Sequence, residues 1–266
     1  MWSELLDNAR VYDLAHALEP TMPVSPNHPG YRMALMRRHG DMVRADGGSA
    51  ANEMIVVGGH TGTHLDALAH VSHRGRLHDG VDAQQAQAGG RFSQLGVETV
   101  EPVFCQGVLL DVAGYRGVPS LPPGEAIGAD ELRAVAAAEA VDLPAGGAVL
   151  VRSGWARYWG DAATYLGQAS GVPGPDASGA EWIAAARPRL TGHDSMAYEH
   201  LAPGAGHALL PVHRILLVDN GVYIIENLDL ERLAAERVHQ FLFVCLPLKF
   251  AGATGSPVRP IAVKLR

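Results

Sequence analysis

Four side chains that can bind a metal ion or move a proton lie within eleven residues of this sequence: His60, His64, Asp66 and His70. Two imidazoles and a carboxylate that leave one coordination position open are the ligand set that a hydrolytic metal ion requires. Such an ion lowers the pKa of its bound water towards ~7, so that a metal-bound hydroxide forms at neutral pH. We therefore interpret His60, His64 and Asp66 as ligands of a divalent cation.

His70 lies close enough in the sequence to accept the proton of that water and to pass it to a leaving group. Imidazole titrates in the pH range that this role needs. The chain has 13 histidines, and five of them fall within nineteen residues. Such a concentration of imidazoles is not expected on a surface that has no function. The last two of these five, His73 and His78, continue into a polar loop, and we expect them to be exposed or at the rim of a substrate site.

The backbone of this motif is predicted to be extended or looped. Gly58, Gly59 and Gly62, together with the two β-branched threonines of the segment, argue against a helix. In an extended chain His64 and Asp66 project to the same side, and a turn at Gly62 can bring His60 alongside. The motif directly follows a predicted strand, which is a common place for a functional loop to leave a rigid scaffold.

A second group of residues lies about 150 positions further on. Glu226 ends an otherwise apolar strand, where a carboxylate is costly unless it is paired or binds a metal. One interpretation pairs Glu226 with an arginine such as Arg214. The other makes it part of the metal site, together with His213.

The remaining pattern predicts one α/β domain with a mixed sheet over residues 1–266. Short runs rich in Val, Ile and Leu and bounded by Gly, Pro or Asp are typical of strands. They are Val11–His16, Met54–Val57, Gly107–Val112, Ala148–Arg152, Val222–Ile225, Gln240–Leu246 and Ile261–Leu265. Helices are predicted over Asp130–Val141 and over Leu228–Val238, the second with Asn227 as its N-cap. The order of the strands does not follow from this pattern.

The composition limits the classes of partner that can be expected. A net charge of −7 gives no electrostatic reason to expect nucleic acid or an anionic membrane. We interpret the basic group Arg32, Arg37, Arg38 and Arg44 as a solvated face, of which one arginine could meet an acidic substrate. The two cysteines, Cys105 and Cys245, lie apart in apolar runs and indicate neither a disulfide framework nor a thiolate site.

Targeting signals are not evident in the sequence. The first residues, Met1 to Asp7, show no basic region followed by an apolar stretch, so we expect no signal peptide. No uncharged apolar run approaches the length of a membrane span. We expect a cytoplasmic protein that acts on a small molecule.

Residues 60–70 resemble the signature H-x-G-T-H-x-D-x-P-x-H of the cyclase family of metal-dependent hydrolases, which includes kynurenine formamidase, isatin hydrolase and trans-dienelactone hydrolase. The chain departs from it only at Leu68, where the signature has proline, and this change affects loop stiffness and not a ligand. The segments 13–24, 152–155 and 213–228 also resemble the family, so the similarity extends over nearly the whole chain.

The resemblance implies a swivelling β/β/α fold and a homo-oligomer, either a dimer or a tetramer. It implies that His60, His64 and Asp66 bind a first metal ion, that His70 moves protons, and that His213 and Glu226 serve a second ion. Members of the family use Zn²⁺ or Mn²⁺, and His, carboxylate and water ligands suit either. With a single ion, His213 and Glu226 would instead orient the water or the first ligands.

We therefore expect a metal-dependent hydrolase in which metal-bound hydroxide attacks the carbonyl of an amide, a cyclic imide or a lactone. One alternative is an N-formylkynurenine formamidase. Another is a non-catalytic, metal-dependent binding protein, against which the presence of His70 argues. The G-x-S-x-G elbow of serine hydrolases and the common nucleotide-binding loops are missing from the sequence. Substrate specificity is expected in loop residues such as His28, Pro29, Tyr31, Trp155 and Tyr198.

Overall fold

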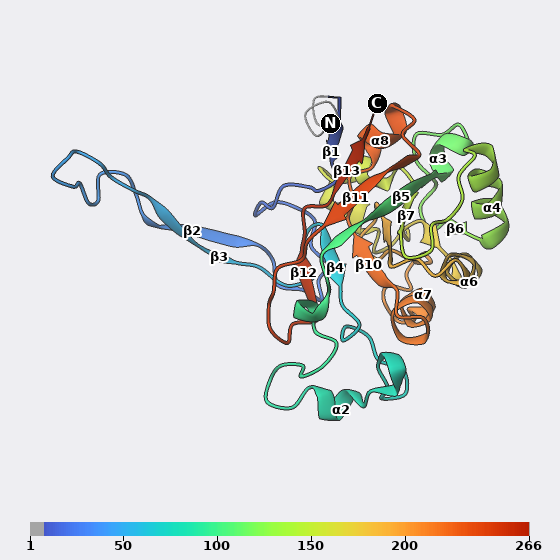
Figure 1. Cartoon of the computed structure of the whole chain (residues 1–266), viewed down its shortest axis with the longest axis horizontal. Helices are drawn as coiled ribbons and strands as arrows, with labels where there is room; N and C mark the ends of the chain where they lie inside the picture. The colour runs from blue at the N-terminus through green and yellow to red at the C-terminus, as the bar shows by residue number, and fades with distance from the viewer. Residues whose placement is uncertain (1–7, 266) are drawn as a thin grey trace.

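A computed structural model describes residues 8–265 and contains one large mixed sheet (Figure 1). The sheet has nine strands in the order β1-β13-β11-β5-β7-β9-β10-β4-β12. In chain order these are β1 (Arg10–Asp13), β4 (His64–Asp66), β5 (Val103–Asp111), β7 (Ala148–Arg152), β9 (Leu190–His193), β10 (Tyr223–Glu226), β11 (Gln240–Cys245), β12 (Gly255–Pro257) and β13 (Ile261–Lys264). The first seven residues, in which we searched for a signal peptide, lie outside the described residues.

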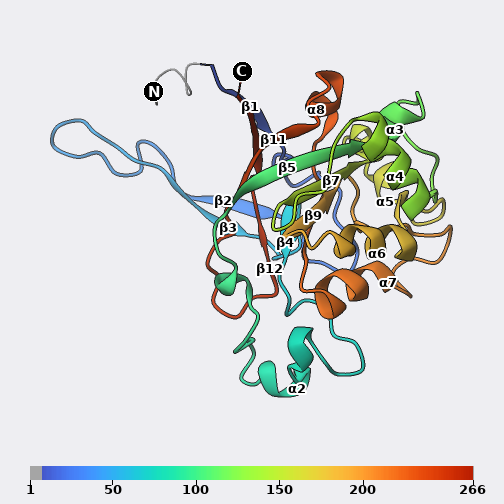
Figure 2. The same ribbon diagram turned by 45° about the vertical axis from the view of Figure 1, so that its right-hand side comes forward.

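Two small sheets stand apart from the large one. Strands β2 (Arg32–Arg37) and β3 (Asn52–Val56) form an antiparallel ribbon that projects away from the body of the molecule (Figures 1 and 2). Strands β6 (Ala126–Ile127) and β8 (Gly174–Pro175) pair in parallel. The ribbon is the longest projection of the molecule.

The helices are short. They are α2 (Ala83–Ala86), α3 (Val112–Tyr115), α4 (Ala129–Ala138), α5 (Ala162–Leu166), α6 (Ala177–Ala185), α7 (Pro211–His213) and α8 (Glu231–Ala235), with the 3₁₀ turns η1 (His78–Gly80), η2 (Val97–Thr99) and η3 (Trp155–Tyr158) and the π-helical segment η4 (Arg214–Asp219). Among residues 8–265 no helix is long and apolar enough to cross a membrane. Where the protein resides in the cell stays a prediction.

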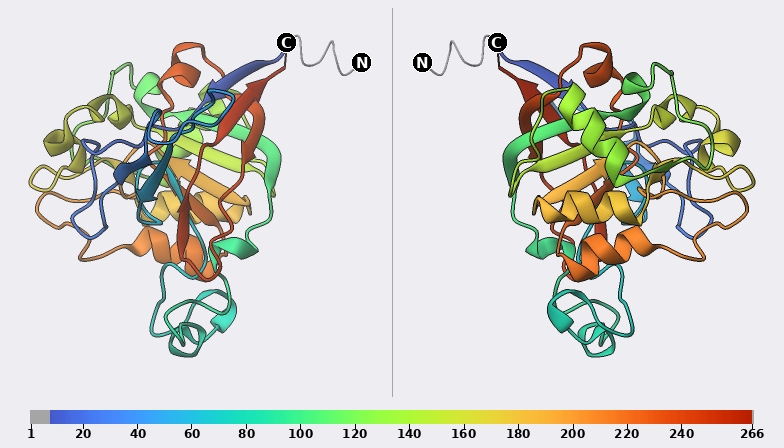
Figure 3. Two further views of the ribbon diagram at one scale, coloured as in Figure 1. Left: turned by 90° about the vertical axis from the view of Figure 1, so that its left-hand side faces the viewer. Right: turned by 90° about the vertical axis from the view of Figure 1, so that its right-hand side faces the viewer.

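The centre of the sheet is parallel and its flanks are antiparallel. Strands β5, β7, β9 and β10 run in parallel. Strands β4 and β11 flank them in the opposite direction, and β13 pairs antiparallel with β11. The central strands are continuous apolar runs because they are covered on both faces. Helices α4 and α6 pack on one face, as Figure 3 shows, and the second core lies on the other face of the curled sheet. This architecture confirms the predicted α/β class with a mixed sheet.

Most of the predicted elements form. The strand predicted over residues 148–152 is β7 with the same bounds, and the other predicted strands appear with ends shifted by a few residues. The predicted helix over 130–141 is α4, with Leu132, Val135 and Ala136 buried. The predicted strand Met54–Val57 exists as β3, but it belongs to the projecting ribbon and not to the scaffold sheet.

The prediction of Asn227 as a helix N-cap is wrong. Helix α8 begins only at Glu231, after Leu230, and not at residue 228. Asn227 has a positive φ of 56°, its Nδ2 donates to the carbonyl of Gly62, and its Oδ1 accepts from the Tyr165 hydroxyl. Its side chain therefore ties the end of β10 to the turn before β4, and the helix begins one turn later than predicted.

A fully buried carboxylate fixes the turn after β7. Asp194 accepts hydrogen bonds from the backbone N–H groups of Ser153, Gly154 and Trp155 and from the Ser153 hydroxyl, at 2.7–3.1 Å. If the carboxylate is removed, these buried donors cannot form hydrogen bonds with water instead. Each buried N–H left unpaired costs about 1–3 kcal/mol.

We expect Asp194→Ala to lower the free energy of unfolding by roughly 3–5 kcal/mol, since it leaves several buried donors unpaired. Asp161→Ala is the matched control, because Asp161 caps the exposed start of α5 by accepting from the Thr164 N–H, and its loss should destabilise the protein much less. Urea unfolding of both variants measures the difference. Equal destabilisation would show that the buried carboxylate does not hold this turn.

Candidate metal centre

The motif predicted to be extended is a strand of the large sheet. His64–Asp66 forms β4, which pairs with β10 on one side and with β12 on the other. Gly62 has φ of 68°, and a Cβ there would overlap the Leu18 side chain, so this turn requires glycine. The turn folds residue 60 back beside residue 66, as the sequence predicted.

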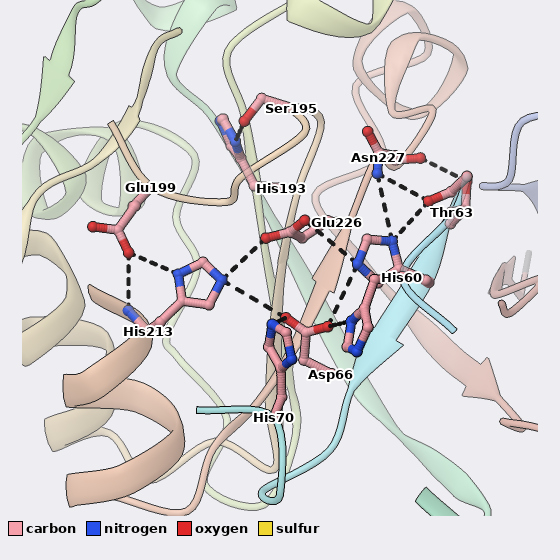
Figure 4. A network of polar contacts seen from close by, with 12 residues as sticks. His60, Thr63, Asp66, His70, His193, Ser195, Glu199, His213, Glu226 and Asn227 are labelled. Carbon is pink, nitrogen blue, oxygen red and sulfur yellow. Dashed lines mark hydrogen bonds and ion pairs between the residues drawn. The ribbon is translucent and has the colours of Figure 1, made fainter. Parts of the chain in front are cut away.

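His60 and Asp66 meet at this turn, as Figure 4 shows, and His64 lies beside Asp66. His60 Nδ1 lies 2.6 Å from Asp66 Oδ1, and its Nε2 lies 2.8 Å from the Thr254 hydroxyl. His64 donates from Nδ1 to the Gly62 carbonyl at 2.8 Å, which leaves its Nε2 3.4 Å from Asp66 Oδ1. The backbone thus orients His64 and aims its free nitrogen at the carboxylate.

Strand pairing brings the second group of residues to the first. Because β10 runs antiparallel to β4, Glu226 lies directly opposite His64, and the closest oxygen and nitrogen of the two are 3.4 Å apart. Glu226 is 5% exposed. Arg214, which the alternative interpretation paired with Glu226, forms its ion pair with Asp219 instead. Glu226 therefore faces the histidines.

His213 ends α7 and reaches the same point from the opposite side. Its Nε2 lies 3.2 Å from Glu226 Oε1 and 3.7 Å from Asp66 Oδ2. Its Nδ1 donates to Glu199 Oε1 at 2.7 Å, and its backbone N–H donates to the same oxygen. Glu199 is 1% exposed. A buried carboxylate that holds one imidazole nitrogen while the other faces the site is the usual support of a metal-binding histidine.

The Asp66 carboxylate shows that this donor set fits a cation. It is 1% exposed, and its Oδ2 is buried without a hydrogen-bond partner. Burying an anionic oxygen without a partner is costly unless a cation compensates it. Ligand atoms of His60, Asp66 and His70 lie within 4.8 Å of one another, and so do those of Asp66, His213 and Glu226. Asp66 is common to both groups, which together form a candidate site for a divalent cation.

His70 lies close enough to this centre to serve either as a ligand or as a proton carrier. Its ring stacks on that of His60 with centroids 3.9 Å apart, and its Nε2 lies 3.9 Å from Asp66 Oδ2. The geometry therefore allows His70 either to move protons or to bind a cation. The roles of all six predicted site residues stay predictions, although the fold brings the six together.

The pKa values differ sharply among the buried imidazoles. Burial lowers the pKa of His70 to about 3, so its ring is neutral at pH 7 and has a lone pair to give. Burial also disfavours the charged forms of His64 and His213, but hydrogen bonds and attraction to the neighbouring carboxylates outweigh it. They raise the pKa of His64 to about 9 and of His213 to about 10. In the metal-free protein these two rings carry protons, which a cation must displace.

A cavity of about 230 Å³ opens onto the centre. It is lined by Ser25, Asn27, His28, His60, His64, His70, Val71, Met196, Ala197, His207, Leu210, His213 and Glu226. Asn27 Nδ2 and His207 Nδ1, 3.1 Å apart, join two segments of its lining. The mixed polar and apolar lining suits a small molecule.

Of the predicted specificity residues, His28 lines this cavity, with its ring centroid 5.4 Å from that of His60. Trp155 and Tyr198 do not line it, because both are fully buried in the core and bond to Tyr165 and Thr191. Pro29 and Tyr31 are also absent from its lining. That a side chain is aromatic therefore does not predict whether it lies in the core or lines the pocket.

Other histidines and cysteines have simpler surroundings. His73 is exposed, as expected, and His78 is half-buried with Nδ1 3.0 Å from the Val218 carbonyl. Cys105 and Cys245 are both free, and Cys245 is buried. None of these residues reaches the centre.

Sequence reasoning missed Glu199 and Thr254, which hold His213 and His60. Neither belongs to a recognisable spacing, since both lie more than a hundred residues from the first motif. The one available signal for Glu199 was a carboxylate directly after the run Met196 to Tyr198, where a buried charge would need a partner.

Comparisons with known proteins identify relatives of this chain. The family model "Cyclase", described as "Putative cyclase", matches residues 12–200. A curated relative, "Cyclase-like protein 2" of Oryza sativa subsp. japonica, is 26% identical over 96% of this chain and 79% of its own length. A solved structure described as a novel cyclase has a TM-score of 0.86 and 28% identity, covering 98% of this chain and 93% of the other.

More distant solved structures share the fold. Isatin hydrolase A from Ralstonia solanacearum has a TM-score of 0.75 and 23% identity over 98% of this chain and 94% of its own. A "predicted metal-dependent hydrolase" from Bacillus stearothermophilus has a TM-score of 0.62 and 20% identity over 96% and 98%. Because the family model covers most of the sequence, this chain belongs to the cyclase family.

We expect Asp66→Ala to lose its bound divalent cation, because Asp66 is shared by both candidate ligand groups. Elemental analysis of the purified variant, beside the unaltered protein and a His73→Ala control, measures the metal per chain. Circular dichroism of the variant checks that the fold survives. Full metal content in a folded Asp66→Ala protein would refute the site.

Glu199 gives a second test. Glu199→Gln keeps the size of the side chain but weakens its hold on His213 Nδ1, so we expect metal affinity to fall by roughly 10- to 100-fold. Competition with a chelator measures the affinity. An affinity equal to that of the unaltered protein would mean that His213 does not serve the cation.

Proposed function

We propose that this protein is a metal-dependent hydrolase that attacks the carbonyl carbon of an amide, a cyclic imide or a lactone in a small molecule. The observation that carries the proposal is the buried Asp66 carboxylate. Its Oδ2 has no hydrogen-bond partner and faces imidazoles where a cavity meets the core. Membership of the cyclase family supports the same class of enzyme.

The relatives support a hydrolytic reaction without fixing the substrate. One solved structure of the same fold, 23% identical, is an isatin hydrolase bound to the product analogue thioisatinate. Others carry the description of predicted or potential metal-dependent hydrolases. We take from them the class of reaction and leave the substrate open within the carbonyl compounds named above.

A divalent cation held by these residues would supply Lewis acidity, which lowers the pKa of water and polarises a carbonyl. We propose Mn²⁺ or Zn²⁺, since imidazole and carboxylate ligands suit both. His60, His64 and Asp66 would hold one ion. His213 and Glu226, together with Asp66, could hold a second. The Gly62 carbonyl accepts a hydrogen bond from His64 Nδ1, and Glu199 accepts one from His213 Nδ1. The Nε2 atoms of both histidines therefore remain available to a cation.

His70 is proposed to move the protons of the reaction. Its Nε2 lies 3.9 Å from Asp66 Oδ2, close enough to the centre to take a proton from an attacking water. The same nitrogen then returns the proton to the leaving nitrogen or oxygen. Stacking against His60 fixes the plane of the ring while this happens.

The cavity wall positions the substrate. Met196, Leu210 and Val71 offer apolar contacts, and Asn27, Ser25 and His28 offer hydrogen bonds opposite the metal ligands. The contact between Asn27 and His207 joins two of the segments that form this wall.

We expect His70→Ala to keep its metal and to lose roughly two to four orders of magnitude in turnover, which is the usual worth of a positioned proton-transfer group. The assay measures hydrolysis of a panel of cyclic amides, imides and lactones, isatin included, and of N-formylkynurenine. His73→Ala, an exposed histidine of the same stretch, is the control. Loss of the metal together with the side chain would make His70 a ligand, and unchanged turnover would remove it from the mechanism.

A further inference from the structure

A second cavity reaches His60 from the side away from Asp66. It has a volume of about 440 Å³, and its lining includes His60, Arg91, Phe92, Ala253 and Thr254. We call it the rear cavity. Among the described residues, His60 alone lines both this cavity and the one at the metal centre. Its Nδ1 faces Asp66, whereas its Nε2 lies 2.8 Å from the Thr254 hydroxyl. A molecule in the rear cavity would therefore contact the support of His60 without blocking the metal centre.

Two chain segments form the rear cavity, the stretch after α2 and the loop before β12 (Figure 1). The Phe92 N–H donates to the Gly252 carbonyl at 3.0 Å and joins the two segments. Gly252 has φ of 75°, and a Cβ there would overlap the Phe92 carbonyl oxygen, so this close approach requires glycine. The volume of the cavity lies in the range of small-molecule sites.

The charge of the rear cavity comes from Arg91. Among residues 8–265 no carboxylate lines the cavity, and the Arg91 guanidinium forms no hydrogen bond or ion pair. The planar guanidinium fork matches the two oxygens of a carboxylate. Phe92 and Ala253, both half-buried, supply apolar surface in the same cavity. The lining therefore suits a small molecule that joins a carboxylate to an apolar group.

The imidazoles at the metal centre differ in what holds their outer nitrogen. A buried carbonyl holds His64 and a buried carboxylate holds His213. The support of His60 is instead the neutral hydroxyl of Thr254, in the wall of the rear cavity. A hydroxyl that accepts from an imidazole N–H still has its own proton to donate. A carboxylate in the rear cavity would accept that proton's hydrogen bond.

We propose that the rear cavity binds a small carboxylate through Arg91 and the Thr254 hydroxyl, and that the bound carboxylate strengthens the hold of His60 on a cation. A hydrogen bond from Thr254 to the carboxylate polarises the hydroxyl, which then accepts more strongly from His60 Nε2 and makes Nδ1 a better ligand. The cation in turn raises the affinity for the carboxylate by the same factor. The effect on the cation rests on the proposed function, and the binding of the carboxylate does not.

Calorimetry on the metal-free protein tests the binding. Benzoate, a carboxylate on an apolar ring, should bind in the millimolar range or more tightly, and its uncharged counterpart benzamide roughly tenfold more weakly. Arg91→Gln should weaken the binding of benzoate by a similar factor. Arg157→Gln is the matched control and should bind benzoate like the unaltered protein. Arg157 is exposed, lies outside the rear cavity and forms no ion pair within the described part of the chain.

Competition with a chelator, with and without benzoate, tests the effect on the cation. Benzoate should raise the affinity for Zn²⁺ roughly fivefold in the unaltered protein and leave it unchanged in Arg91→Gln. Thr254→Val removes the hydroxyl at nearly constant size, so it should lower the affinity for Zn²⁺ and abolish the response to benzoate. Thr254→Ser should keep both. Circular dichroism checks the fold of each variant.

Three results would overturn the carboxylate site. They are a metal-free protein that does not bind benzoate, equal binding of benzamide, and an Arg91→Gln protein that binds benzoate as tightly as the unaltered one. An affinity for Zn²⁺ that stays the same when benzoate is bound would overturn the coupling. If the protein binds benzoate through Arg91 but binds no Zn²⁺, the site stands and the proposed function fails.

Discussion

The centre of this molecule depends on one buried carboxylate. Asp66 lies in the middle strand of three, nearly inaccessible to water, with one oxygen beside His60 and the other without a hydrogen-bond partner. Removing a carboxylate from water costs several kcal/mol, which positive charge nearby must offset. Chain segments far apart in the sequence meet at this oxygen, because β4 pairs with β10 and α7 ends against them.

Groups outside the cluster decide which nitrogen each imidazole presents. The Gly62 carbonyl holds His64, Glu199 holds His213, and Thr254 holds His60. An imidazole held at one nitrogen presents the other in a fixed direction, which lowers the entropy lost when a ligand or a proton arrives.

The local part of the site could be predicted from the sequence, and its long-range part could not. Gly62 and the alternation of His64 and Asp66 set local backbone geometry, so the turn and the shared side of the strand followed from residue type. Apolar runs likewise predicted the strands. The roles of Asn227 and Glu199 are set by contacts across more than a dozen residues, which periodicity does not contain. Trp155 was placed at the pocket because an aromatic side chain in a loop can serve a core or a ligand equally well.

The central claim is that a divalent cation binds at Asp66. Anomalous diffraction from crystals of the protein saturated with Mn²⁺, and separately with Zn²⁺, tests it most directly. We expect an anomalous peak beside the Asp66 carboxylate among the imidazoles of His60, His64 and His213, with a second peak near Glu226 if two ions bind. Crystals of the loaded protein that show no peak at Asp66, or show peaks only elsewhere on the chain, would contradict the claim.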